Sequence, residues 1–446
     1  MSEHGGPPVS EPAKGGAAGG AHPLSLDAPV AVRSLDMSQG FPDLKLPPAR
    51  SGAPYRGLAV LVRSGDEPIG WLWVEAPATG EVTAEVLERA CREQLAPGSG
   101  EAQSEPAPPR RAGSEQPQVP PAFVSHVITT CNQAPAVVRC MRAIIASESG
   151  PFELIVVENR PAHSTVRDVL RSAFPGDDRI RACDEPIPGL SRARNAGFRA
   201  ARGTIVAFTD DDIVVDPGWS GSVRQAFADY PDVSCVTGPI LPAELETPAE
   251  MLMERFATLG KGFVRRAYSL DRPPESEEQP LFPYTAGYFG SGGNAAFRLD
   301  ALFALGGFDL ALGTGTPARG GEDLDIFIRL ILAGRTLLYE PGAVVWHPHP
   351  DTMKRLSSEV FDYGVGLGAM LTKQLVAGPH RFRMIEKIPG GLGYLFGPGS
   401  RKNASKGPDY PSRLDRREQV GLAMGPAAYA RSRWQERRLN AARGRV

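Results

Sequence analysis

Residues 204–217 read TIVAFTDDDIVVDP and decide the fold, because an apolar, β-branched run ends abruptly in three adjacent carboxylates. A short run with no polar alternation is typical of a strand that is buried on both faces of a sheet. Within the cluster Asp210, Asp211 and Asp212, each ionised carboxylate makes ionisation of the next one less favourable. The end of this strand is therefore a place where the chain needs a partner for negative charge.

Strand and helix patterns alternate on both sides of this run. Such alternation predicts an α/β fold with a parallel sheet and helices on both of its faces. Strands are expected at FVSHVITT (123–130), FELIVVEN (152–159), IRACDE (180–185), TIVAFT (204–209) and SCVTGPI (234–240), and helices at 136–147, 163–174, 190–202 and 219–230.

Polar side chains follow three of these strands at the point where each one ends. Thr130 and Asn132 follow the first strand, Glu158 ends the second, and the acidic triplet 210–212 ends the fourth. In an open α/β sheet, ligands bind beyond the carboxyl ends of the strands. The sequence therefore predicts that these clusters converge on one ligand site at the rim of the sheet.

A divalent cation would relieve the repulsion within the triplet. In an extended segment residues i and i+2 point the same way, so Asp210 and Asp212 can share one ion. Hard oxygen ligands suit Mg²⁺ or Mn²⁺. The alternative is a solvated turn in which Asp212 or Asp216 caps the next helix.

A glycine-rich motif, FGSGGNAAFR (289–298), follows about eighty residues later. Gly293 and its neighbouring glycines let the backbone approach a ligand closely, and Asn294 offers an amide to a sugar hydroxyl. The alternative is an ordinary tight turn before a strand.

An acidic pair and two histidines complete the set of candidate residues. Glu322 and Asp323 stand at the start of a helical pattern, where simple capping of the helix dipole is the alternative to chemistry. His347 and His349 follow the apolar run AVVW. An imidazole there can complete a carboxylate metal site, although a structural role is the alternative.

Together these motifs resemble the family 2 glycosyltransferases, which have the GT-A fold. The resemblance implies a Rossmann-like, mostly parallel sheet flanked by helices, to which this chain adds a small N-terminal α+β module. It spans residues 123–350, and the matching motifs stand in the family's order: VITTCNQ, FELIVVENRP, PGLSRARNAGFRAARGTIVAFTDDDIVVDPGW, FGSGGNAAFR, GGFD, GGEDLDIFIRL and VVWHPHP.

The resemblance implies a role for each acidic motif. Asp210 and Asp212 form a DXD-type motif that holds Mg²⁺ or Mn²⁺ on the diphosphate of a nucleotide sugar, and His347 completes that metal site. Asp211 faces the sugar or the ribose. Asp323, next to Glu322, is the catalytic base.

The resemblance also implies a nucleotide site. This site combines residues at the ends of the first two strands, residues of the ARN motif (193–195), and Gly293 and Asn294 of the glycine-rich loop. The chain departs from the family pattern at Glu158, where aspartate is usual, and at Cys131, where an aromatic ring is common. The nucleotide-site residues are Thr130, Asn132, Glu158, Arg194 and Asn195.

The expected reaction is metal-dependent transfer of a sugar, most often from a UDP-sugar, to an acceptor hydroxyl with inversion. A hydroxyl is a poor nucleophile and needs a base, and the leaving nucleoside diphosphate needs a cation. The partners are the nucleotide-sugar donor and an acceptor that is a glycan, a lipid-linked glycan or a natural product, as in glycoconjugate biosynthesis. The alternatives are a nucleotidyltransferase of similar fold and a noncatalytic binding protein. The loop TTCNQAPA has neither the glycine nor the lysine that a nucleotidyltransferase phosphate loop requires.

The composition divides the chain into five parts. Residues 1–25 are expected to be disordered, 26–96 form the small module, 97–121 a Pro-rich linker that lets the module move independently, and 122–350 the GT-A domain. Residues 351–446 are a helical extension with an arginine-rich tail. That tail is either solvated or in contact with an anionic membrane surface.

Bulk properties exclude several other classes. A formal net charge of −2 over 446 residues gives a nucleic-acid partner no electrostatic support. The five cysteines form no CxxC pair, which indicates a reducing cytoplasm. Within the cytoplasm, the inner face of the membrane is a further expected location of the protein. No apolar run reaches the roughly 18 residues of a transmembrane helix, and the N-terminus lacks the apolar core of a secretory signal.

Overall fold

The computed structural model describes most of the chain outside its N-terminal segment and linker. The segments expected to be disordered (1–25) and to form the linker (97–121) lie outside the described residues, as does Asn132. The described residues are 27–95, 122–131, 134–160, 166–256, 259–273, 281–378, 380–397, 400–404, 406 and 410–443.

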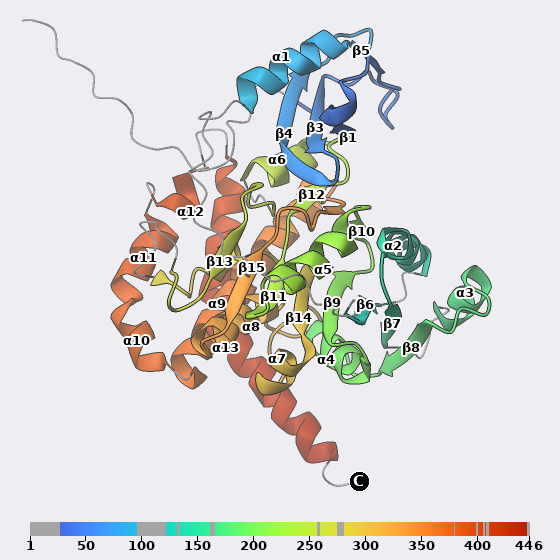
Figure 1. The fold of residues 1–446 in the computed structure, drawn as a ribbon. Coiled ribbons are helices and arrows are strands. Elements are labelled where there is room, and N and C mark those ends of the chain that lie inside the picture. The colour runs from blue at the N-terminus through green and yellow to red at the C-terminus, as the bar shows by residue number, and fades with distance from the viewer. Residues whose placement is uncertain are drawn as a thin grey trace, which may run out of the picture.

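An eight-stranded sheet forms the centre of the molecule (Figure 1). Its strand order is β13-β15-β11-β14-β9-β6-β7-β8. β9, β6, β7 and β8 pair in parallel, as do β11 and β15, whereas β14 is antiparallel to both of its neighbours and β13 is antiparallel to β15. The expected mostly parallel α/β architecture is confirmed. The strands are β6 Val124–Thr130, β7 Phe152–Asn159, β8 Ile180–Glu185, β9 Ile205–Asp210, β11 Val233–Thr237, β13 Arg266–Tyr268, β14 Asn294–Arg298 and β15 Thr336–Tyr339.

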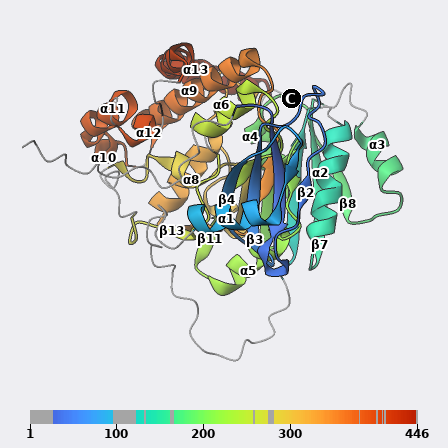
Figure 2. The ribbon, with the colours of Figure 1, turned by 90° about the horizontal axis from the view of Figure 1, so that it is seen from above.

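Helices cover both faces of this sheet (Figure 2). Along β9, Ile205 and Ala207 join the core beneath α2, α3 and α5, whereas Val206 and Phe208 join the core beneath α4, α7 and α8. Because successive strand residues point to opposite faces, a strand covered on both sides is apolar throughout. The helices are α2 Ala134–Ser147, α3 Val166–Ala173, α4 Leu190–Ala200, α5 Trp219–Asp229, α6 Pro248–Phe256, α7 Leu299–Ala304 and α8 Glu322–Leu332.

A second, three-stranded sheet joins the main domain to the N-terminal part of the chain. It contains β10 (Val214–Val215), β16 (Val345–His347) and β12 (Ile240–Pro242), in that order. The expected α+β module lies against it at the top of Figure 1. The module contains β1 Val30–Asp36, η1 Met37–Gln39, β2 Leu44–Lys45, β3 Gly57–Ser64, β4 Glu67–Glu75, β5 Glu81–Val82 and α1 Ala84–Gln94.

The module is packed against the second sheet, contrary to the expectation that it moves independently. Arg63 and Asp216, both buried, form an ion pair of 2.6 Å. Trp71 packs on Trp346 of β16, with ring centroids 6.3 Å apart. A buried ion pair and shared aromatic packing are typical of a fixed interface.

The C-terminal extension packs on the core through two long helices that run in the same direction. α9 (Met353–Ala377) and α13 (Ser412–Arg443) cross so closely that a Cβ added to Gly368 would lie 2.3 Å from the Leu422 carbonyl oxygen. Glycine is therefore required at that contact. The connection between them is α10 (Arg381–Glu386), α11 (Ile388–Phe396) and α12 (Arg401–Ala404), at the left of Figure 1. Across the described residues, no helix has the length and apolar character needed to span a membrane.

Candidate functional site

A single arginine joins the two acidic motifs. α4 carries Arg194 into the interior, where its guanidinium donates to Asp210 at the end of β9 and to Glu322 at the start of α8, both at 3.0 Å. The arginine is almost completely buried, so these contacts are made away from bulk water. The structure therefore brings the aspartate triplet and the Glu322-Asp323 pair to one place at the rim of the sheet.

The glycine-rich loop closes over this arginine. A Cβ added to Gly292 would lie 2.6 Å from Arg194 Nη1, and one on Gly293 would lie 2.8 Å from Asp210 Oδ2. The Gly292 amide donates to Asp323 Oδ2 at 2.9 Å. Close approach of the backbone to charged side chains, and not only the turn, therefore requires these glycines.

The acidic pair at the start of α8 lies in the first helical turn and also makes contacts outside the helix. The N-cap residue is Gly321, with φ of 83°, which has no side chain to cap the helix. Glu322 is turned to Arg194, and burial together with the neighbouring Asp323 raises the pKa of Glu322 to about 7 against the opposing effect of Arg194. Asp323 accepts main-chain hydrogen bonds from Gly292 and Leu324, which fix the direction of its carboxylate.

Asp211 points back to the first strand of the sheet. The Thr130 hydroxyl donates to Asp211 Oδ2 at 2.5 Å. Burial raises the pKa of Asp211 to about 6, and the neighbouring Asp212 and Asp210 act in the same direction. The resemblance implied that Asp211 faces the sugar or ribose, whereas the structure pairs its carboxylate with Thr130.

Asp212 and His347 face each other at the open side of the site. His347 Nε2 lies 3.6 Å from Asp212 Oδ1. Burial lowers the pKa of His347, although Asp212 and Asp210 oppose that effect. The Nδ1 atom of His347 is buried without a hydrogen-bond partner among the described residues. His349 is instead paired with buried Glu254 at 3.1 Å.

The side chains present fit only part of a metal site. Among the described residues, no three His, Cys, Asp or Glu side chains are arranged to hold a metal ion by themselves. Asp210 is already bound by Arg194, which leaves Asp212 and His347 as a pair. Mg²⁺ is often bound by one or two carboxylates together with substrate phosphates. The chemistry of this pair therefore suits an ion shared with a phosphate ligand.

Glu158 offers an unused acceptor at the end of β7. It is buried beside Thr130 in the sheet register, and its Oε1 atom has no hydrogen-bond partner in the described part of the chain. A buried carboxylate oxygen without a donor is unfavourable by about 1–3 kcal/mol or more. A ligand hydroxyl or N–H group would satisfy it.

Two predicted nucleotide-site residues belong to the scaffold instead. Asn195 exchanges two main-chain hydrogen bonds with Phe308, both at 2.8 Å. Asn294 accepts from the Trp219 indole at 2.9 Å, and its amide donates to two main-chain carbonyls. Both amides are buried and fully occupied, so neither is directed at a ligand here.

Two residues of α9 reach the site and were not predicted from the sequence. Burial of the hydroxyl and the negative charges of Glu359, Asp323 and Asp210 raise the pKa of Tyr363, although its side chain as a whole is 48% exposed. Burial raises the pKa of Glu359, with a contribution from Asp212. The segment carries no motif, and only the packing of α9 against α8 brings these side chains to the acidic cluster.

Comparison with known proteins finds similarity in the central segment of the chain. Residues 125–305 match the family described as Glycosyl transferase family 2. A pre-mycofactocin glycosyltransferase of Mycobacterium tuberculosis is 30% identical over 257 residues, which is 55% of this chain and 48% of the relative. A glucosyl-dolichyl phosphate glucuronosyltransferase of Haloferax volcanii is 25% identical over 211 residues, 46% of this chain and 62% of the relative. The match thus spans about half to three-fifths of these relatives.

Among solved structures, a mannosyltransferase from Pyrobaculum calidifontis in complex with GDP-Man and Mn²⁺ is similar with a TM-score of 0.44 and 19% identity. The alignment covers 72% of this chain and 79% of that one.

Proposed function

Because residues 125–305 match glycosyltransferase family 2, we propose that this chain transfers a glycosyl group from a nucleotide-diphosphate sugar to an acceptor hydroxyl. The observation that carries the proposal is the position of Arg194 between Asp210 and Glu322. This contact brings the carboxylates of two distant motifs together at the rim of the sheet.

Asp323 is the base in this proposal. Two main-chain N–H groups orient its carboxylate, which keeps further lone pairs for a proton. The acceptor oxygen forms a bond to the anomeric carbon, the bond from that carbon to the diphosphate breaks, and the acceptor proton passes to Asp323. Attack opposite the leaving diphosphate inverts the anomeric centre.

Asp212 and His347 would hold Mg²⁺ or Mn²⁺ against the donor diphosphate. A bound ion would supply electrostatic stabilisation of the leaving group. Arg194 keeps Asp210 and Glu322 in place and offsets part of their negative charge. The unpaired oxygen of Glu158 and the Thr130 end of β6 would contact the nucleoside.

The donor is proposed to be a UDP-sugar, as is common in the family. The acceptor is defined only as a hydroxyl on a glycan, a lipid-linked glycan or a natural product. By their names, the two relatives act on different acceptors, pre-mycofactocin and glucosyl-dolichyl phosphate, so they do not narrow this choice.

Release of nucleoside diphosphate from a panel of nucleotide sugars tests the proposal. We expect release with at least one donor in the presence of Mn²⁺, and loss of release after addition of EDTA. Release of pyrophosphate, or no release with any donor, would contradict it. Binding of a donor should also raise the unfolding temperature by mass action, which identifies the donor before an acceptor is known.

A further inference from the structure

The C-terminal helices carry most of the exposed apolar side chains. Of the fourteen large hydrophobic residues that are exposed in the described part of the chain, all but Met37, Leu270 and Phe303 lie beyond residue 352. Monomeric proteins rarely expose large contiguous apolar patches, and those that do use them to bind something.

The clearest patch is one stripe along α10 and α11, formed by Phe382, Ile385, Ile388 and Leu392. These side chains are exposed by 69%, 50%, 39% and 52%. Their spacing of three or four residues places them on one side of a helical path. α11 has the sequence IPGGLGYLF, yet none of its residues is buried. The apolar side of α10 and α11 therefore faces outward, the reverse of an ordinary surface helix.

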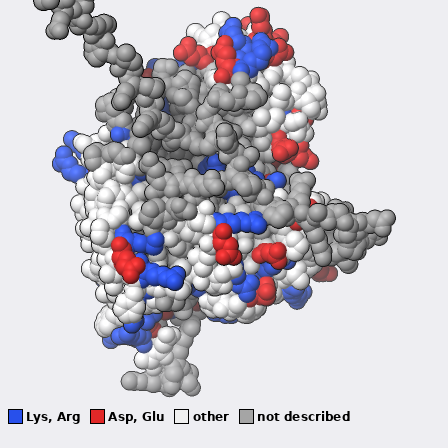
Figure 3. Space-filling view, turned by 60° about the vertical axis from the view of Figure 1, so that its left-hand side comes forward, with Lys and Arg blue, Asp and Glu red and all other residues white. Residues whose placement is uncertain are grey.

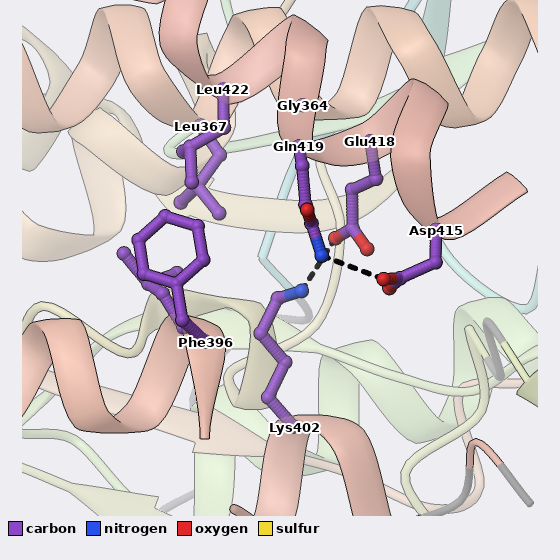
Figure 4. Close-up of a pocket in the computed structure, with 9 residues that line it drawn as sticks. Gly364, Leu367, Phe396, Lys402, Asp415, Glu418, Gln419 and Leu422 are labelled. Atoms are coloured by element: carbon purple, nitrogen blue, oxygen red, sulfur yellow. Dashed lines mark hydrogen bonds and ion pairs between the residues drawn. The ribbon is translucent and has the colours of Figure 1, made fainter. Parts of the chain in front are cut away.

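The backbone of this segment is anchored, so the exposure does not come from detached ends. Met384 is buried, and the Tyr394 hydroxyl lies 3.1 Å from that of Tyr288. At the far end, Lys402 is paired with Glu418 of α13 at 2.6 Å, beside the small cavity that Phe396 helps to line (Figure 4).

Positive charge accompanies the apolar stripe. Arg381, Arg383 and Lys387 lie on the same two helices or between them, together with the single acid Glu386. The Arg381 guanidinium lies 5.0 Å from the ring centroid of Phe382. Figure 3, which brings this side of the molecule forward, shows broad white areas in which both blue and red groups occur.

We propose that the α10–α11 stripe binds the surface of an anionic lipid bilayer. Apolar side chains of an interfacial helix enter the boundary between head groups and acyl chains, while Lys and Arg contact anionic head groups. A second copy of this chain fits less well, because a two-fold contact would set the same basic residues opposite one another.

The stripe lies on the same structural unit as one wall of the candidate site. Tyr394 of α11 contacts Tyr288 in η4 (Ala286–Tyr288), and η4 leads directly into the loop whose Gly292 and Gly293 contact Asp323 and Asp210. A bilayer bound by α11 would therefore be linked to that loop through one contact, between Tyr394 and Tyr288, and a few residues of chain. The proposal itself does not depend on the chemistry at the site.

Co-sedimentation of the full chain with vesicles tests this proposal without any donor. We expect the chain to bind vesicles of phosphatidylcholine with phosphatidylglycerol and to bind pure phosphatidylcholine vesicles at least severalfold more weakly. Leu392→Glu should weaken binding roughly tenfold or more, because it replaces an inserted apolar side chain by a charge. The double variant Arg381→Gln with Arg383→Gln should weaken binding severalfold and reduce its salt dependence.

Met37→Glu is the matched control, since Met37 is exposed by 39%, the same as Ile388, but lies on the N-terminal module. It should bind like the unaltered chain, and the variants should keep the unaltered melting temperature. No binding to anionic vesicles, or equal loss in Met37→Glu and Leu392→Glu, would overturn the proposal. Conversion of a dimer to a monomer by Leu392→Glu, without vesicle binding, would assign the stripe to self-association and overturn it as well.

Discussion

Arg194 and Asp210 form a hydrogen-bonded ion pair of 3.0 Å inside the protein, and the same guanidinium reaches Glu322. Helix α4 and strand β9 are consecutive in the sequence, whereas α8 begins more than a hundred residues later. Arg194 therefore holds together two acidic motifs that lie far apart in the sequence. The geometry of the whole candidate site depends on this buried contact.

Replacement of Arg194 should destabilise the protein. Arg194→Ala would leave the buried carboxylate of Glu322 without its cation, a change of about 3–5 kcal/mol in the free energy of unfolding. Arg194→Lys keeps one charge but not the two-sided geometry, so it should retain more stability than Ala and still lose activity. Urea unfolding measures the first effect. Equal stability of the Ala variant and the unaltered chain would contradict it.

The N-terminal module should support the metal-binding edge. Asp216 pairs with Arg63 of the module and accepts from the Trp346 indole at 3.1 Å, next to His347. Arg63→Ala should lower the unfolding free energy by about 3–5 kcal/mol and weaken Mn²⁺-dependent binding of donor. Arg56→Ala is the control, because Arg56 forms only an exposed ion pair with Asp27. Donor affinity unchanged in Arg63→Ala would show that the module does not position His347.

Gly292 should tolerate no side chain. Because an added Cβ would stand 2.6 Å from Arg194 Nη1 and 2.8 Å from Asp323 Cβ, Gly292→Ala should reduce turnover by roughly tenfold or more, as small displacements of catalytic groups do. Gly287→Ala, where the added atom meets nothing within 4 Å, should behave like the unaltered chain. Comparable rates for both variants would mean that the loop adjusts freely.

Thr130 should contribute stability through Asp211. Thr130→Ala removes the donor to a buried carboxylate and should lower the unfolding free energy by about 1–3 kcal/mol. Thr130→Ser keeps the hydroxyl and should recover most of the loss. Chemical unfolding compares the three proteins, and a Ser variant as unstable as the Ala variant would assign the effect to the lost methyl group.

The sequence predicted what local patterns determine. The unbroken apolar run of β9 and its neighbours indicated strands covered on both faces, and the carboxyl ends of those strands located the site. Local sequence patterns could not predict contacts between segments that are distant in the chain. Arg194 was expected in the nucleotide site, and its link between two acidic motifs was not foreseen. Asn195 and Asn294 bond main-chain groups that only the folded chain brings near. Tyr363 and the docking of the module likewise depend on tertiary packing.

The most direct test of the central claim compares Asp323→Asn with the unaltered chain in the presence of Mn²⁺ and the donor found by thermal shift. Asp300→Asn, an exposed acid on α7, is the control. We predict that Asp323→Asn binds the donor with unchanged affinity but releases nucleoside diphosphate about 10²–10⁴-fold more slowly, as expected for loss of a general base. Turnover of Asp323→Asn at the rate of Asp300→Asn would contradict the proposed role of Asp323 and the reaction built on it.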